Sequence, residues 1–92
     1  MEAEFYALEL IPESDHIVLR VLPSVLRPGT QLRSKRYPDL DAILSALKQL
    51  RTPEIPLGDV EKCRSDLRNG KNYLLRGYLR LTPTQVQWLI GP

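Results

Sequence analysis

The last twenty residues of the chain constrain its fold more than any other segment. Along residues 73–81, mostly apolar positions alternate with positions that include two arginines and a tyrosine. This period of two is typical of a β-strand. Thr82 follows, with Pro83 and Gln85 behind it, so the threonine can cap a helix while the glutamine reaches back to the threonine N–H. A glycine–proline pair then ends a short helix. The sequence therefore predicts a strand that passes directly into a helix.

Five further segments each show the periodicity of either a β-strand or an α-helix. Residues 4–11, 16–22 and 31–37 are rich in strand-forming residues and alternate to different degrees. Residues 39–51 and 57–68 carry apolar side chains at helical spacing and therefore form amphipathic helices. Proline, glycine and asparagine residues between these segments supply the turns.

The order of these segments indicates the fold class. Amphipathic helices beside a mostly antiparallel sheet predict an α+β two-layer sandwich, with about four strands in the order β-β-β-α-α-β-α and the helices on one face. The last strand has to return across the helices, and we expect it to lie beside the first strand. We expect residues 1–92 to form one small domain, which leaves little core for a deep substrate cavity.

Composition narrows the functional classes. Thirteen cationic and eleven anionic side chains leave a net charge of only +2, so the whole molecule is not steered toward nucleic acid or a membrane surface. The single cysteine, Cys63, cannot form an internal disulfide, and the acidic N-terminus does not resemble a signal peptide. No apolar run approaches the roughly 20 residues of a membrane helix. We therefore expect a cytoplasmic protein with no membrane partner.

Charge is arranged in blocks along the chain. Residues 1–15 carry five carboxylates and no cation, whereas residues 16–36 carry five cations and no carboxylate. Residues 67–92 carry four cations and again no carboxylate. If the first strand lies between two basic strands, cross-strand ion pairs are the simplest result.

One predicted sheet face gathers arginine and tyrosine. Strand alternation allows Arg20, Arg76, Tyr78 and Arg80 to share the face that points away from the core. Cations beside an aromatic ring suit single-stranded nucleic acid, because the cations hold phosphates and the ring stacks on bases. A solvated, ion-paired sheet face has the same composition, so both interpretations remain open.

A short basic run lies next to a predicted turn. Arg33, Lys35 and Arg36 fall within four consecutive residues and could contact phosphate or an acidic protein. The same charges also protect an edge strand from pairing with another chain.

The single tryptophan lies off the apolar stripe of the last helix. Val86, Leu89 and Ile90 cluster on one side of that helix, and at about 100° per residue Trp88 points away from them. Tryptophan is enriched at interface hot spots, so Trp88 is a candidate anchor for a partner or a second copy. Alternatively, it covers the edge of the core.

Residue types that carry catalysis are scattered. Cys63 falls on an apolar helical stripe, and His16 follows a turn with Asp15. One histidine and one cysteine do not make a usual zinc site. Asp39 and Asp41 lie at the start of a predicted helix, where their negative charges interact favourably with the helix dipole. Phosphate-binding loops, dinucleotide motifs and nucleophile elbows are missing from the sequence, so we predict no enzymatic activity, catalytic residue, metal or cofactor.

These observations favour a small binding or regulatory module that acts through protein–protein contacts, as an accessory subunit, an inhibitor or a homodimer. The candidate contacts are Trp88, Arg76, Tyr78, Arg80 and Arg20. The alternative is a domain that binds single-stranded nucleic acid through the arginine and tyrosine face, helped by the basic run. An enzyme would need a pocket that gathers the lone histidine with several carboxylates.

Overall fold

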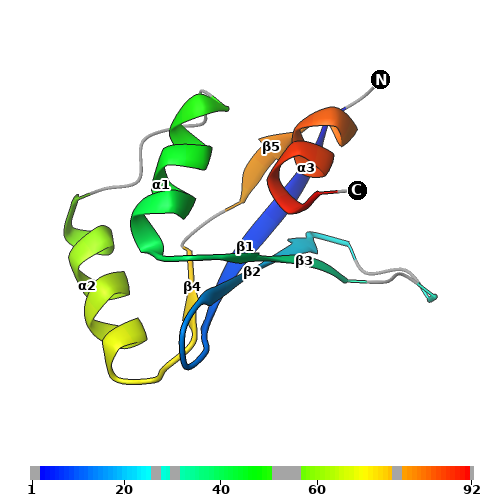
Figure 1. The fold of residues 1–92 in the computed structure, drawn as a ribbon. Helices are drawn as coiled ribbons and strands as arrows, with labels where there is room; N and C mark the ends of the chain where they lie inside the picture. The colour runs from blue at the N-terminus through cyan, green and yellow to red at the C-terminus, as the bar shows by residue number, and fades with distance from the viewer. Residues whose placement is uncertain (1–2, 26–27, 30–31, 51–56, 76–77, 92) are drawn as a thin grey trace.

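The computed structural model describes the backbone of residues 3–25, 28–29, 32–50, 57–75 and 78–91, and the side chains of all of these except 57–59. In chain order these residues form β1 (Glu4–Pro12), β2 (Ile17–Pro23), β3 (Arg33–Tyr37), α1 (Leu40–Gln49), α2 (Leu57–Arg68), β4 (Tyr73–Leu74), β5 (Leu79–Leu81) and α3 (Pro83–Ile90). An antiparallel sheet with helices beside it confirms the α+β class (Figure 1).

The first strand lies inside the sheet. The strand order is β3-β2-β1-β4, and β5 also pairs with β1, on the side where β4 pairs. All the pairings are antiparallel. The end of the chain therefore returns to lie beside the beginning, as the sequence predicts.

The closing strand is interrupted, so the prediction of one strand over residues 73–81 is wrong. Glu9 of β1 pairs with Leu74, and Tyr6 of β1 pairs with Leu79. Two residues of β1 therefore lie opposite four residues of the closing segment, which is an irregularity of the bulge type. Because the excess is an even number, the same alternation between the two sheet faces holds in β4 and in β5.

The hairpin between β1 and β2 turns directly after Pro12. Pro12 is the last residue of β1 and pairs with Ile17, while the Glu13 N–H donates to the His16 carbonyl at 2.9 Å. The turn between the two strands therefore spans residues 13–16. Proline has no N–H to donate and is tolerated at the end of a strand.

Side-chain caps fix the N-termini of α1 and α3. The Asp39 carboxylate accepts the Ala42 N–H at 2.8 Å, so the residue expected to favour the dipole of α1 also caps it. At α3 the Thr82 hydroxyl accepts the Gln85 N–H at 3.2 Å, and the Thr82 N–H donates to the Gln85 side chain at 2.8 Å. This is the predicted capping box.

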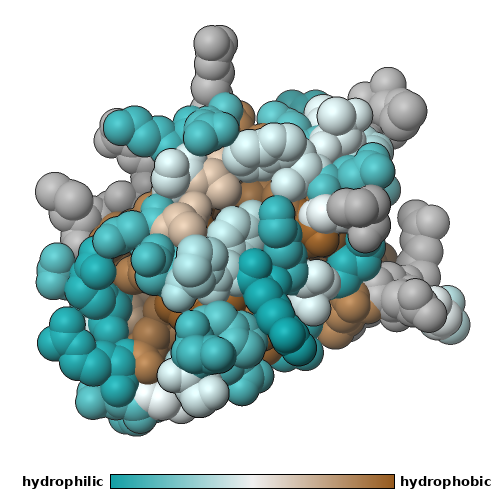
Figure 2. Space-filling view, viewed as in Figure 1, coloured by the Kyte–Doolittle hydropathy of each residue, from teal (hydrophilic) through white to brown (hydrophobic). Residues whose placement is uncertain are grey.

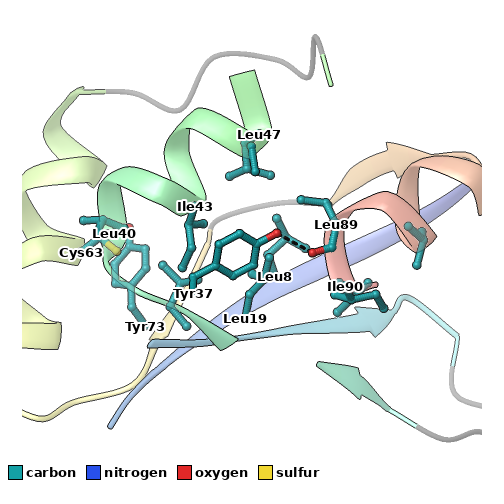
Figure 3. Packing of buried hydrophobic residues seen from close by; sticks show 14 of the residues in the cluster. Leu8, Leu19, Tyr37, Leu40, Ile43, Leu47, Cys63, Tyr73, Leu89 and Ile90 are labelled. Carbon is teal, nitrogen blue, oxygen red and sulfur yellow. Dashed lines mark hydrogen bonds between the residues drawn. The ribbon is translucent and has the colours of Figure 1, made fainter. Parts of the chain in front are cut away.

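The core lies between the helices and one face of the sheet. Figure 3 shows side chains from strands and helices converging around Tyr37, whose hydroxyl donates to the Leu89 carbonyl. The buried core residues are Leu8, Leu10, Leu19, Val21, Tyr37, Leu40, Ile43, Ala46, Leu47, Cys63, Tyr73, Leu81, Val86, Leu89 and Ile90. Burial raises the pKa of the Tyr37 hydroxyl, because the phenolate is poorly solvated there.

Candidate interaction surface

Apolar surface is not confined to the interior. Figure 2 shows brown apolar surface between teal polar side chains on the side of the molecule in view. Among the described residues, the large hydrophobic side chains that remain exposed are Phe5, Val25, Leu32, Leu74, Tyr78 and Trp88. They lie on different parts of the fold and therefore belong to more than one surface.

The sheet has a second face, which points away from the core. Leu8 and Leu10 of β1 and Leu19 of β2 are buried against the helices, so their neighbours along each strand point the other way. We call this side the outer face; the strand pairings give it Phe5, Ala7, Glu9, Ile11, Val18, Arg20, Leu22, Ser34, Arg36, Leu74 and Arg80. In the described part of the chain, the helices contribute their buried residues to the opposite side.

An ion pair lies at the centre of the outer face. Glu9 of β1 is directly opposite Arg20 of β2. The Arg20 Nε donates to Glu9 Oε1 at 2.9 Å, and Nη2 donates to the same oxygen. The side chains of Arg20 and Glu9 are 35% and 20% exposed, so each is partly desolvated. Arg20, a candidate contact residue, therefore already has a carboxylate partner, as the charge blocks suggest.

Apolar pairs flank this ion pair on both sides. Ala7 lies opposite Leu22, and Ile11 lies opposite Val18. All four side chains are partly exposed. We call each such pair of facing residues a row. The centre of the outer face therefore consists of one charged row between two apolar rows.

The β4 and β5 side of the outer face exposes larger groups. Phe5 is 53% exposed and lies opposite Arg80, while Leu74 is 56% exposed and lies opposite Glu9. Tyr78 immediately precedes β5 and is 58% exposed. Arg76, another candidate contact residue, lies outside the described residues. Strand alternation alone identifies Phe5 and Leu74 as outward-facing, so the sequence carries a signal for these two apolar contacts.

The basic run does not form one cationic patch. Its pairing with β2 puts Arg33 and Lys35 on the helix side of β3 and Arg36 on the outer face. The Arg33 Nη2 donates to the Gly91 carbonyl at 2.6 Å. The Lys35 Nζ lies 5.2 Å from the centroid of the Tyr37 ring, within the range of a cation–π contact. The three cations therefore have separate surroundings.

Trp88 belongs to the helical layer. Its side chain is 46% exposed and lines an open groove of about 300 Å³. The other lining residues are Gln49, Leu50, Thr84 and Gln85, from the end of α1 and from α3. Since the helices cover the core side of the sheet, Trp88 and the outer face form two separate surfaces.

A larger open groove of about 500 Å³ lies at one end of the sheet. Its lining includes Val86 and Ile90 of α3 together with Glu4, Tyr6 and Arg33. The Tyr6 hydroxyl donates to Glu4 Oε2 at 3.4 Å, and burial followed by the Glu4 charge raises the pKa of Tyr6. The ends of several elements form this groove, and nothing in the local sequence pattern indicates it.

The reactive side chains lie apart from both grooves. Cys63 is buried in the core, and burial raises the pKa of its thiol to about 11. The His16 Nδ1 lies 2.6 Å from Asp15 Oδ1, and this hydrogen bond lowers the pKa of Asp15. Within the described ranges, no group of three potential metal ligands comes together.

Over the part of the chain that the structure describes, none of the helices combines the length and apolar character needed to cross a bilayer. The sequence matches no protein-family model, and searches of curated proteins and of solved structures find no match.

Proposed function

We propose that the protein is a small non-enzymatic binding module that acts through protein–protein contacts made by the outer face. The observation that carries this proposal is the pair of apolar rows beside the Glu9–Arg20 ion pair, on the side of the sheet away from the core. Protein interfaces combine an apolar centre with few unpaired charges and a polar rim. The internally neutralised pair leaves the centre of this face without an unpaired charge.

Two other features fit such a role. Trp88, on the helical layer, supplies a second anchor of the residue type that is enriched at hot spots. The free thiol of Cys63 is buried, which suits a protein that works in the reducing cytoplasm. An accessory subunit, an inhibitor and a homodimer would all use the outer face.

The test is a comparison of surface variants. Val18→Lys puts a charge into an apolar row, and Ser65→Lys adds the same charge at an exposed position of α2. We expect the Ser65→Lys control and the wild-type chain to associate equally, either with themselves on sizing or with a stoichiometric host protein on capture. Val18→Lys should lose that association while its circular dichroism stays unchanged. Equal association of folded Val18→Lys and wild type would refute the proposal.

Single-stranded nucleic acid is the second candidate, because one observation favours it. The rings of Phe5 and Tyr78 are exposed beside Arg80, which together resemble a stacking platform with a cation. Against it, Arg20 is occupied by Glu9, and the basic run is divided between two sides of the sheet.

Binding of labelled single strands at low salt tests this candidate. It predicts an affinity that falls steeply as salt rises and that weakens in Arg80→Ala but not in the exposed α2 variant Arg68→Ala. No shift of the oligonucleotide at low salt removes the candidate.

A further inference from the structure

We infer that the partner of the outer face is a second copy of this chain, bound face to face about a two-fold axis that places Glu9 of each copy over Arg20 of the other. This inference deepens the proposed function and rests on it. The charge complementarity of the outer face and its area support this arrangement.

The ion pair selects the symmetry. In an isologous contact of two flat faces, the two-fold axis lies in the plane of the interface. An axis that runs across the strands through this row puts Glu9 over Glu9 and Arg20 over Arg20, so like charges meet. An axis that runs parallel to the strands, between β1 and β2, puts each charge over the opposite charge of the second copy. Only the second arrangement is electrostatically complementary.

The same axis also matches the apolar rows. It exchanges β1 with β2 of the second copy and keeps each row at its own level along the strands. Ile11 therefore lies over Val18 of the second copy, and Ala7 lies over Leu22. When two sheets pack face to face in this aligned way, their strand directions stay within about 30° of each other. The rows of the two copies therefore match best at the central row.

The remaining cations of the outer face do not oppose one another. Arg80 belongs to the row of Phe5, whereas Arg36 belongs to the row of Ile11 and Val18. Those rows are six residues apart along β1, or about 20 Å at the usual rise of a strand. The two arginines therefore remain at the rim, where charges are tolerated.

The area indicates a weak dimer. Among the described strands the face is four strands wide, and residues 5–11 of β1 give its length. With about 4.8 Å between strands and about 3.4 Å per residue, each copy covers a plane of roughly 450 Å². Two copies contribute about 900 Å², close to the lower limit of roughly 1,000 Å² for a specific interface. We therefore expect a reversible dimer that dissociates on dilution.

Charge exchange between two variants tests the arrangement. Glu9→Arg leaves two arginines in the central row, and Arg20→Glu leaves two glutamates, so each variant repels its own copies. An equimolar mixture places two arginines over two glutamates and should form a heterodimer. The double variant Glu9→Arg/Arg20→Glu restores opposite charges and should form a homodimer again.

Sedimentation equilibrium from about 10 μM to about 1 mM covers the range in which weak interfaces dissociate. We expect dimers of the wild type, of the double variant and of the mixture, and monomers of each folded single variant. The controls Glu61→Arg and Arg68→Glu make the same charge changes on exposed positions of α2 and should dimerise like the wild type. A wild type that stays monomeric at about 1 mM, or a mixture of folded variants that stays monomeric, overturns the inference.

A cross-link provides a readout that does not depend on charge. An oxidised mixture of Ile11→Cys and Val18→Cys chains should give a covalent dimer, and Ser65→Cys chains treated in the same way should not. Equal cross-linking of both samples overturns the inference. If the wild type is monomeric but Val18→Lys still abolishes capture of a different host protein, the homodimer fails and the proposed function stands.

Discussion

The hydroxyl of Tyr37 donates to the main-chain carbonyl of Leu89 inside the core, and this bond joins β3 to α3 across 52 positions of the chain. It satisfies a carbonyl in the last turn of α3, where the backbone has no helical donor for it. The ring packs among the apolar core residues at the same time. One side chain therefore supplies both core volume and a polar link between two elements.

Tyr37→Phe should lower the free energy of unfolding by about 1–3 kcal/mol, because it keeps the ring but leaves the buried Leu89 carbonyl without its donor. Urea unfolding monitored by tryptophan fluorescence measures the change. Tyr78→Phe removes a hydroxyl from an exposed ring and should stay within about 0.5 kcal/mol of the wild type. Equal stabilities of the two variants would show that the hydrogen bond contributes nothing.

Alkaline pH should destabilise the fold through Cys63. Burial raises the pKa of its thiol from 9.0 to about 11, so the unfolded chain loses this proton at a lower pH than the native chain. The stabilising contribution is complete below pH 9 and is lost as the pH rises toward 11. The loss amounts to about 2–3 kcal/mol.

Unfolding free energies at pH 8 and pH 10.5, measured in reducing buffer, test this prediction. Cys63→Ala has no thiol to ionise and should lose less stability over that interval than the wild type does. Parallel pH profiles of the two proteins would contradict the prediction, whatever the offset between them at neutral pH.

Thr82→Ala should destabilise the protein by about 1 kcal/mol, because the Gln85 N–H loses the hydroxyl that caps it. Thermal unfolding compares it with Thr84→Ala, which changes an exposed threonine in the first turn of the same helix. That control should be neutral or slightly stabilising, since alanine favours helix. A greater loss of stability in Thr84→Ala than in Thr82→Ala would show that Thr82 is not the residue that caps α3.

Trp88→Ala should leave the outer-face dimer intact, because the tryptophan lies on the helical layer and lines a separate groove. Its 46% exposure also limits the effect on stability. Leu89→Ala, one residue later and fully buried, should instead lose about 2–5 kcal/mol. Sedimentation and urea unfolding separate the two effects. Loss of the dimer in folded Trp88→Ala would place the interface on the helices.

Local chemistry made several parts of the fold predictable. The capping box at Thr82 and Gln85 depends on residues three apart, and the inward positions of each strand follow from alternation. The position of the last strand beside β1 followed from the return of the chain across the helices. Each of these features is encoded within a few residues or in the order of the elements.

The interruption between β4 and β5 was not predictable from alternation. The closing segment has two more residues than the stretch of β1 that it faces, and an excess of two leaves the period of two unchanged. The pattern from residue 73 to residue 81 therefore reads as one continuous strand. An excess of one residue would have inverted the alternation and revealed the break.

The candidate surface was predictable only in part. Alternation placed Arg20 and Arg80 on the outer face, but the partner of Arg20 depends on which residue of β1 lies opposite it. Likewise, the side of β3 that carries Arg33 and Lys35 depends on pairing with β2. Register is a relation between strands, so these assignments need the assembled sheet.

The pairing of β1 with β5 has a consequence for biosynthesis. Residues 4–6 meet their neighbours at residues 79–81, so a growing chain carries the first strand out of the ribosome long before its second neighbour exists. Until β4 and β5 have been made, β1 has the hairpin partner β2 but an open edge on its other side. Completion of the sheet must therefore wait until residues 79–81 have been translated, and a nascent chain that stalls before residue 73 presents that unpaired edge to chaperones and to other nascent chains.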